Sequence, residues 1–337
     1  MKIVFFELEE WEKDYLKQRI PNQDVHFFTE KVKDANIENV KDADIVATFV
    51  FSPFTKDVLD KFPNLKLLTT MSTGYDHIDL DECKRRGITV TNVPAYGDNT
   101  VAEHAFGLML NLSRNIHKAY LRTSKENNFS YDGLIGFDLK GKTLGVLGTG
   151  RIGLNSIHIA KGFNMNIIAY DAFQRPELQE QYGFKYVELD ELYRTSDIIT
   201  IHVPLLKTTH HMINKESISK MKDGVLIINT ARGPIIDTDA LIEGLDSGKI
   251  GGVGLDVLEG ELLIKDEKEI VHTLNNLPKE QMSLLLKNHS LMHRPNAIIT
   301  PHLAFYSKEG MLRILDTTLE NIYDLIEERG FKYEVKQ

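Results

Sequence analysis

The sequence predicts an α/β protein with two doubly wound parallel sheets. Short apolar runs rich in β-branched residues alternate with longer segments whose apolar residues recur at helical spacing. Apolar strands separated by helices are typical of parallel sheets covered on both faces. The length of 337 residues suits two such domains.

Ten strands are expected, in two sets. The first set comprises residues 2–6, 45–49, 66–70 and 89–92. The second set comprises residues 143–147, 166–170, 198–202, 225–229, 252–256 and 297–300. Apolar residues at helical spacing predict connecting helices that include 101–121, 152–162 and 238–247.

The domain boundaries follow from two of the helices. Thr100 and Glu103 have the spacing of a capping box that opens a helix from Val101 to about Leu121. This helix is expected to carry the chain between domains. The final helix, 307–328, has no sheet of its own before it and is expected to return to the first domain. We therefore expect one domain from residues 1–100 plus 301–337 and another from residues 101–300.

Composition excludes several classes of protein. The net charge of −9 argues against nucleic-acid binding, which needs a clustered basic face. No apolar run approaches the roughly 20 residues needed to cross a bilayer, so no membrane partner is expected. The single cysteine, Cys83, and an amino terminus that soon turns acidic favour a cytoplasmic protein.

The run from Gly148 to Gly153 has the GxGxxG spacing of a dinucleotide-binding loop. Such glycines also mark ordinary turns, but this run follows an apolar strand and opens an apolar helix, as the fingerprint requires. Gly148 permits the tight turn, Gly150 admits a pyrophosphate, and Gly153 lets the helix pack against the strand. Asp171, which ends the next strand, would bind the adenosine ribose hydroxyls and favour NAD over NADP.

Three polar residues follow later strands at the edge where open α/β sheets bind ligands: Arg232, Glu261 and His302. Taken singly, they could be a surface ion pair, a solvated acid and a helix cap. Together they suit reduction of a 2-oxo acid, because arginine offers a fork for the carboxylate and histidine offers a proton near neutral pH. A nearby carboxylate would hold the histidine tautomer.

The chain resembles the D-isomer-specific 2-hydroxyacid dehydrogenases from end to end. The matching segments, in order, are Ser72–Asp79, Val93–Tyr96, Gly148–Gly153, His202–Pro204, Ile228–Gly233, Gly254–Asp256 and Thr300–His302. The resemblance implies a flavodoxin-like substrate domain, a Rossmann NAD-binding domain and NAD as cofactor.

The resemblance also implies residue roles. His302 would be the general acid and base, Glu261 its partner, and Arg232 the ligand of the substrate carboxylate and carbonyl. Thr73, Gly74 and Tyr96 would complete the substrate pocket from the first domain. Besides Gly148, Gly150, Gly153 and Asp171, the cofactor residues would be Arg151, Ile152, Val203, Pro204, Thr209, Thr230, Ala231 and Asp256, the last orienting the nicotinamide carboxamide.

Within the family, the chain resembles the D-lactate dehydrogenase branch, on Tyr96, the long segment 261–295 and the aromatic pair Phe305 and Tyr306. We therefore expect reduction of pyruvate to D-lactate. Met71 stands where many relatives carry a basic residue, which leaves a larger branched or aromatic 2-oxo acid as the alternative. An NAD-sensing interaction protein ranks below both. The resemblance further implies a homodimer.

Other patterns suggest no metal site. His289 and His293, four residues apart, and the adjacent His210 and His211 lack an evident third ligand. The acidic run 259–269 is expected to be solvated apart from Glu261. The stripe Ala105, Leu108, Met109 and Leu112 is expected to be core or subunit interface.

Overall fold

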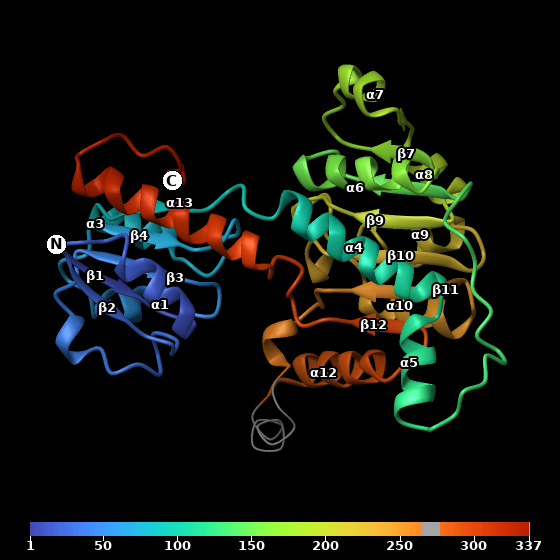
Figure 1. The fold of residues 1–337 in the computed structure, drawn as a ribbon, viewed down its shortest axis with the longest axis horizontal. Coiled ribbons are helices and arrows are strands. Elements are labelled where there is room, and N and C mark those ends of the chain that lie inside the picture. Colours follow the sequence, from blue (N-terminus) through green and yellow to red (C-terminus); the bar gives the residue numbers. More distant parts are fainter. Residues whose placement is uncertain (265–276, 337) are drawn as a thin grey trace. The chain divides into compact units, whose positions relative to one another are not determined.

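The structure is a computed structural model that describes residues 1–264 and 277–336. The chain divides into two compact units (Figure 1). Unit 1 is Met1–Tyr96 with Ser307–Gln337, and unit 2 is Gly97–Tyr306. Each unit contains one sheet whose strands are all parallel, which confirms the predicted α/β class.

Unit 1 has a five-stranded sheet of flavodoxin-like order, β2-β1-β3-β4-β5. Helix α13 packs on β4, where the Asn321 amide donates to the hydroxyl of Thr69. The strands are β1 (Lys2–Phe5), β2 (Asp24–Phe27), β3 (Ile45–Thr48), β4 (Leu67–Thr70) and β5 (Thr89–Thr91). The helices are α1 (Glu10–Lys17), η1 (Glu38–Val40), α2 (Lys56–Leu59), α3 (Leu80–Arg86) and α13 (Lys308–Ile326).

Unit 2 has a seven-stranded sheet of Rossmann order, β12-β11-β10-β9-β6-β7-β8. The strands are β6 (Thr143–Leu147), β7 (Asn166–Tyr170), β8 (Lys185–Tyr186), β9 (Ile198–Ile201), β10 (Val225–Asn229), β11 (Ile250–Leu255) and β12 (Ala297–Ile299). The helices are α4 (Asp98–Ser113), α5 (Ile116–Ser124), α6 (Arg151–Gly162), α7 (Pro176–Tyr182), α8 (Leu189–Thr195), α9 (Lys215–Lys220), η2 (Gly233–Ile235), α10 (Thr238–Asp246), η3 (Glu261–Leu263) and α12 (Lys279–Met292).

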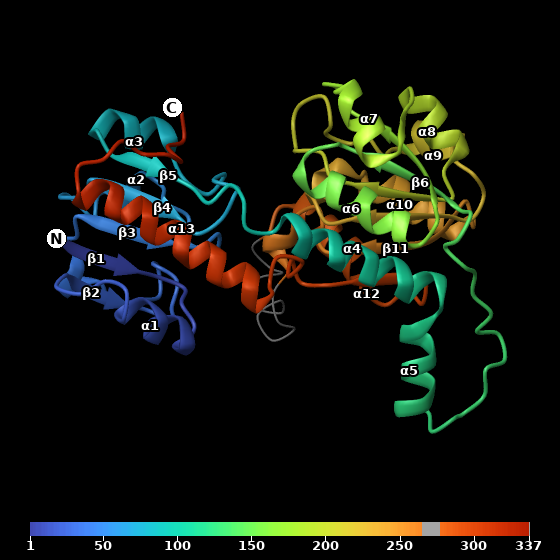
Figure 2. The ribbon, with the colours of Figure 1, turned by 45° about the horizontal axis from the view of Figure 1, so that its top comes forward.

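Helices cover both faces of the unit 2 sheet. Helices α4 and α6 lie side by side on one face (Figures 1 and 2), and their apolar residues form one core cluster with β6 and β7. Residues of α8, α9 and α10 form a second cluster with β9, β10 and β11. The stripe from Ala105 to Leu112 belongs to the first cluster, so it is core. Removal of this apolar surface from water is the main force that holds the layers together.

The long helix predicted from Val101 to Leu121 is wrong at both ends. Helix α4 begins at Asp98 after Gly97, so Thr100 lies inside it and makes no capping box; Glu103 accepts instead from the Asn99 amide. The helix ends at Ser113 because Asn115 adopts a left-handed conformation with φ of 51°, and α5 starts afresh at Ile116.

Two strands were not predicted from the sequence. Strands β2 and β8 each lie at the edge of their sheet. Strand β2 has no fully buried residue, and β8 is two residues long, so neither carries the continuous apolar run that marks the interior strands.

Candidate active site

The three candidate catalytic residues follow three neighbouring strands of unit 2. Arg232 follows β10, Glu261 follows β11 and His302 follows β12. The strands are parallel, so their carboxyl ends lie along one edge of the sheet. The order of the strands therefore places the three loops side by side there.

The structure brings His302 and Glu261 into direct contact. The Nδ1 atom of His302 lies 2.8 Å from Oε1 of Glu261, and each side chain is about one-third exposed. His302 adopts a left-handed backbone with φ of 53°, which a residue with a side chain rarely adopts. Such backbone strain persists where surrounding contacts fix it and is concentrated at functional sites.

The buried carboxylate of Asp256 fixes the strained turn around His302. Its Oδ1 accepts from the Thr300 hydroxyl and from the Leu303 N–H at 2.9 Å, and its Oδ2 accepts from the Ala304 N–H at 2.8 Å. The Asp256 carbonyl also accepts from the His302 N–H at 2.8 Å. Asp256 therefore binds a side chain just before His302 and the backbone N–H groups of His302 and of the two residues after it. Its predicted contact with the nicotinamide carboxamide stays a prediction.

Asn229, at the end of β10, holds the loop that carries Arg232. Its buried side chain donates to the Arg232 carbonyl at 3.0 Å and accepts from the Ala231 N–H at 3.0 Å. The half-buried guanidinium of Arg232 donates to the Ala231 carbonyl at 2.7 Å. No role was predicted for Asn229 from the sequence. Its position, as a polar residue at the end of an otherwise apolar strand, could have indicated one.

The glycine loop has the shape of a dinucleotide cradle. Gly148 has φ of 95°, and a Cβ there would meet the His202 carbonyl at 2.7 Å. A Cβ at Gly153 would lie 2.0 Å from the Gly148 carbonyl oxygen, so α6 packs against the loop only with glycine there. A Cβ at Gly150 would meet nothing within 4 Å, which leaves room above the start of α6.

Other groups around the loop also fit a bound dinucleotide. Asp171 Oδ2 accepts from the Thr149 N–H at 2.7 Å, which sets its carboxylate against the loop. The buried Thr230 hydroxyl has no hydrogen-bond partner among the described residues, so it is available to a ligand. Beneath the loop, burial lowers the pKa of His202 to about 4 and keeps its imidazole neutral. The open space at Gly150, the position of the Asp171 carboxylate and the unpartnered Thr230 hydroxyl therefore fit a bound NAD.

The remaining predicted cofactor residues line the same edge of the sheet. Arg151 begins α6 and lies 3.4 Å from the carboxylate of Asp98. The Thr209 hydroxyl donates to the Pro204 carbonyl at 2.6 Å and stabilises the turn after β9. The roles of these residues and of Ile152, Val203 and Ala231 stay predictions.

The predicted substrate residues of unit 1 lie in the loops after β4 and β5. The Thr73 hydroxyl donates to the Val93 carbonyl at 2.9 Å, and the Gly74 carbonyl accepts from the Ser72 hydroxyl at 2.6 Å. The Tyr96 carbonyl accepts from Nε of Arg313 at 2.7 Å. Their contribution to substrate binding stays a prediction.

The expectation that His210 and His211 lack a third ligand is wrong. One donor atom from each, together with a carboxylate oxygen of Glu259, lie within 4.8 Å of one another. Glu259 is also not simply solvated, because its Oε1 lies 2.9 Å from Nε2 of His211. The part of the acidic run at 265–269 lies outside the described residues. The rings of His289, on α12, and His293, which follows its last residue, are tilted by 35° to each other, with centroids 4.4 Å apart.

The chain is similar to known proteins over nearly its whole length. The model of the D-isomer specific 2-hydroxyacid dehydrogenase NAD-binding domain matches residues 106–304. An aromatic 2-oxoacid reductase of Clostridium sporogenes is 45% identical over 272 residues, covering 80% of this chain and 78% of the relative. A D-lactate dehydrogenase of Escherichia coli is 36% identical over 331 residues, covering 96% and 97%. The structure of D-lactate dehydrogenase from Aquifex aeolicus complexed with NAD and lactic acid has a TM-score of 0.82 at 38% identity, covering 97% and 96%.

Proposed function

The chain belongs to the D-isomer-specific 2-hydroxyacid dehydrogenases, which are NAD-linked oxidoreductases, and on that basis we propose that it reduces pyruvate to D-lactate. The main observation in favour of the proposed chemistry is the 2.8 Å contact between His302 and Glu261. It lies at the edge of the unit 2 sheet where the loop with Arg232 also lies. A histidine oriented by a carboxylate is a suitable proton donor near neutral pH.

Each catalytic side chain has one proposed task. The guanidinium of Arg232 holds the substrate carboxylate and stabilises the negative charge that develops on the carbonyl oxygen. Glu261 accepts a hydrogen bond from the Nδ1–H group of His302, so the proton on Nε2 is the one delivered to that oxygen and later replaced from solvent. Bound NADH supplies the hydride for the carbonyl carbon. The products are the hydroxy acid and NAD.

Larger 2-oxo acids are the second candidate substrates. The relative from Clostridium sporogenes is named an aromatic 2-oxoacid reductase and is 45% identical. Met71 supports an apolar substrate side chain, because it is buried at the end of β4 where it offers no charge. Comparison of pyruvate, 2-oxoisocaproate and phenylpyruvate by kcat/KM separates the two candidates.

We further assign unit 1 as the substrate domain and unit 2 as the NAD-binding domain of a cytoplasmic homodimer. Exposed apolar side chains support a protein interface on unit 2, namely Ile116, Tyr120 and Leu121 on α5 and Phe129, Tyr131 and Ile135 after it. No helix among the described residues is long and apolar enough to span a membrane. Light scattering of the purified chain is expected to give twice the monomer mass.

The test of the proposed chemistry is His302→Ala. Turnover of pyruvate is expected to disappear, while NADH fluorescence titration gives wild-type affinity because the glycine loop is untouched. Retained turnover would place the proton donor on another residue. Loss of NADH binding together with turnover would indicate structural damage rather than loss of a proton donor.

A further inference from the structure

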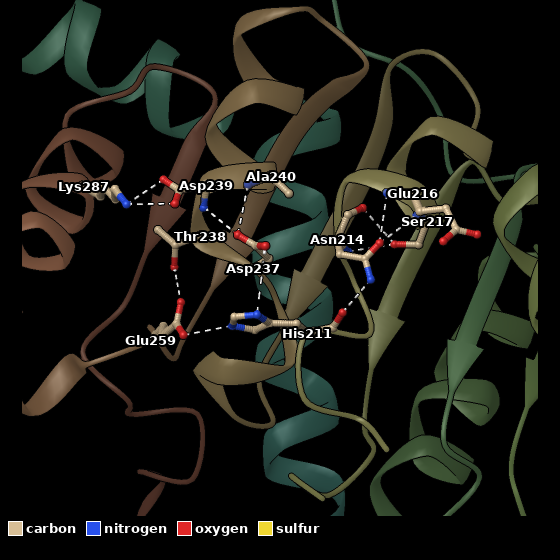
Figure 3. Close-up of polar contacts among 10 residues, drawn as sticks. All are labelled: His211, Asn214, Glu216, Ser217, Asp237, Thr238, Asp239, Ala240, Glu259 and Lys287. Atoms are coloured by element: carbon tan, nitrogen blue, oxygen red, sulfur yellow. Dashed lines mark hydrogen bonds and ion pairs between the residues drawn. The ribbon is translucent and has the colours of Figure 1, made fainter. Parts of the chain in front are cut away.

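We propose that Glu259 and His211 are positioning residues that hold the catalytic loops of β10 and β11 together. Figure 3 shows the arrangement, in which the Glu259 carboxylate lies between His211 and Thr238. These three residues are called here the Glu259 clamp. The inference rests on the proposed function, since it concerns how Arg232 and Glu261 are held for that reaction.

Glu259 joins three parts of unit 2 that are distant in sequence. Its Oε1 lies 2.9 Å from Nε2 of His211, in the loop after β9, and its Oε2 accepts from the Thr238 hydroxyl at 2.8 Å, at the start of α10. Its carbonyl accepts from the buried amide of Asn288 on α12 at 2.8 Å. Both carboxylate oxygens and the backbone of this residue are therefore fixed.

His211 connects the clamp to the loop of Arg232. Its N–H donates to the carbonyl of Pro234 at 2.9 Å, two residues beyond Arg232, while its ring reaches Glu259. Its backbone is left-handed, with φ of 50°. A residue with a side chain keeps this conformation only where its surroundings fix it.

The clamp lies directly against the catalytic backbone. A Cβ at Gly233 would lie 2.1 Å from the carbonyl carbon of Leu258 and 2.4 Å from the Glu259 nitrogen, so the two loops touch at this point. The Leu258 N–H donates to Oε2 of Glu261 at 3.2 Å, and the Glu261 N–H donates to the Leu258 carbonyl at 3.2 Å. A shift of the Leu258–Glu259 peptide would therefore displace both Arg232 and Glu261.

His211 and Glu259 already satisfy each other, so the clamp needs no metal ion even though His210 could supply a third donor. Dialysis against EDTA is expected to leave kcat/KM unchanged. Activity that is lost in EDTA and restored by Zn²⁺ would overturn the proposal, because the cluster would then act as a metal site.

The decisive variant is Glu259→Ala, compared with Glu259→Gln and Asp239→Ala. We expect Glu259→Ala to lower kcat/KM for the 2-oxo acid about 10- to 100-fold, since displacements near 1 Å at reacting groups can cost about that much. NADH affinity should stay within about twofold. Glu259→Gln should recover most of the loss, because its amide can accept from Thr238 and donate to a neutral His211.

Asp239→Ala is the matched control. Asp239 lies next to Thr238 and pairs with Lys287 at 2.7 Å. Its side chain is 65% exposed, and among the described residues its hydrogen bonds and ion pairs reach neither catalytic loop. Wild-type kcat/KM is expected for this variant. An equal loss in Asp239→Ala and Glu259→Ala, or no loss in Glu259→Ala, would overturn the proposal.

Two further measurements keep the inference separate from the proposed function. In His211→Asn, asparagine can adopt the left-handed backbone but the imidazole ring is removed. If His211 and Glu259 act through the same contact, the double variant with Glu259→Ala should lose no more kcat/KM than the more damaging single variant. Faster amide hydrogen exchange at residues 256–264 in Glu259→Ala or His211→Asn reports the released loop without any turnover. If the wild type reduced no 2-oxo acid, the proposed function would be refuted, but the exchange rates would still show whether the Glu259 clamp holds the loop. Unchanged exchange in both variants would refute the positioning role of Glu259 and His211.

Discussion

Asp256→Asn tests whether a buried carboxylate holds His302 in its strained turn. Asp256 is 1% exposed and accepts from the Thr300 hydroxyl and from the N–H groups of Leu303 and Ala304. Asparagine keeps the shape of the side chain but has one acceptor oxygen instead of two. Whichever way its amide points, at least one of the two backbone N–H groups then faces an NH₂ group rather than an acceptor.

The loss follows from these contacts. A buried N–H without an acceptor costs about 1–3 kcal/mol, and hydrogen bonds to a charged acceptor are about twice as strong as neutral ones. We therefore expect the free energy of unfolding to fall by about 1–3 kcal/mol. Because the affected N–H groups directly follow His302, the imidazole should shift and kcat should fall about 10- to 100-fold.

Urea unfolding and steady-state kinetics measure the two effects, with NADH titration beside them. Asp223→Asn is the control, since Asp223 is 91% exposed and pairs with Lys249 at the surface. A fall in kcat at unchanged NADH affinity would assign the loss to the His302 turn, whereas weakened NADH binding would favour the nicotinamide role. Wild-type stability and kcat in Asp256→Asn would refute the reasoning.

Three further variants test other parts of the account. Arg232→Lys loses the planar fork, so kcat/KM for pyruvate should fall at least about 100-fold; near-normal catalysis would remove its assigned role. Gly153→Ala brings a Cβ to 2.0 Å from a backbone oxygen, so NADH affinity should fall more than about tenfold by fluorescence titration, and unchanged affinity would contradict the close packing of α6. Burial raises the pKa of Glu12 from 4.5 to about 7. Between these two pH values the carboxyl is protonated in the folded protein and ionised in the unfolded chain. The free energy of unfolding therefore falls as the pH rises from 4.5 through 7. Glu12→Gln should therefore gain about 2–3 kcal/mol in urea unfolding at pH 8 and clearly less at pH 5, and an equal gain at both would show that Glu12 does not titrate this way.

The interior strands could be predicted because their pattern is local. The bounds of β6, β7 and β10 match those expected from apolar, β-branched runs. The edge strands β2 and β8 lack such runs and were missed. The break between α4 and α5 was missed because apolar periodicity does not record the left-handed conformation of Asn115. The Asn115 side chain donates to the carbonyls of Leu134 and Ile135, which lie about 20 residues further along the chain.

Some residues of the candidate site could be predicted from the sequence and others could not. Arg232, Glu261 and His302 could be proposed because strand ends of a parallel sheet lie on one edge, and the contact of His302 with Glu261 crosses 41 residues of sequence. Glu259 could not be distinguished from the other residues of the acidic run 259–269, because its partner His211 lies 48 residues away in another loop. Only the folded backbone brings these two side chains together.

The reaction proposed for this protein is NADH-dependent reduction of a 2-oxo acid to its D-hydroxy acid. The most direct test follows NADH oxidation by the purified protein with pyruvate, 2-oxoisocaproate and phenylpyruvate, and determines the chirality of the product. The highest kcat/KM is expected with pyruvate, and D-lactate is the expected product. Tight NADH binding without oxidation by any of the three acids, or an L-product, would contradict it.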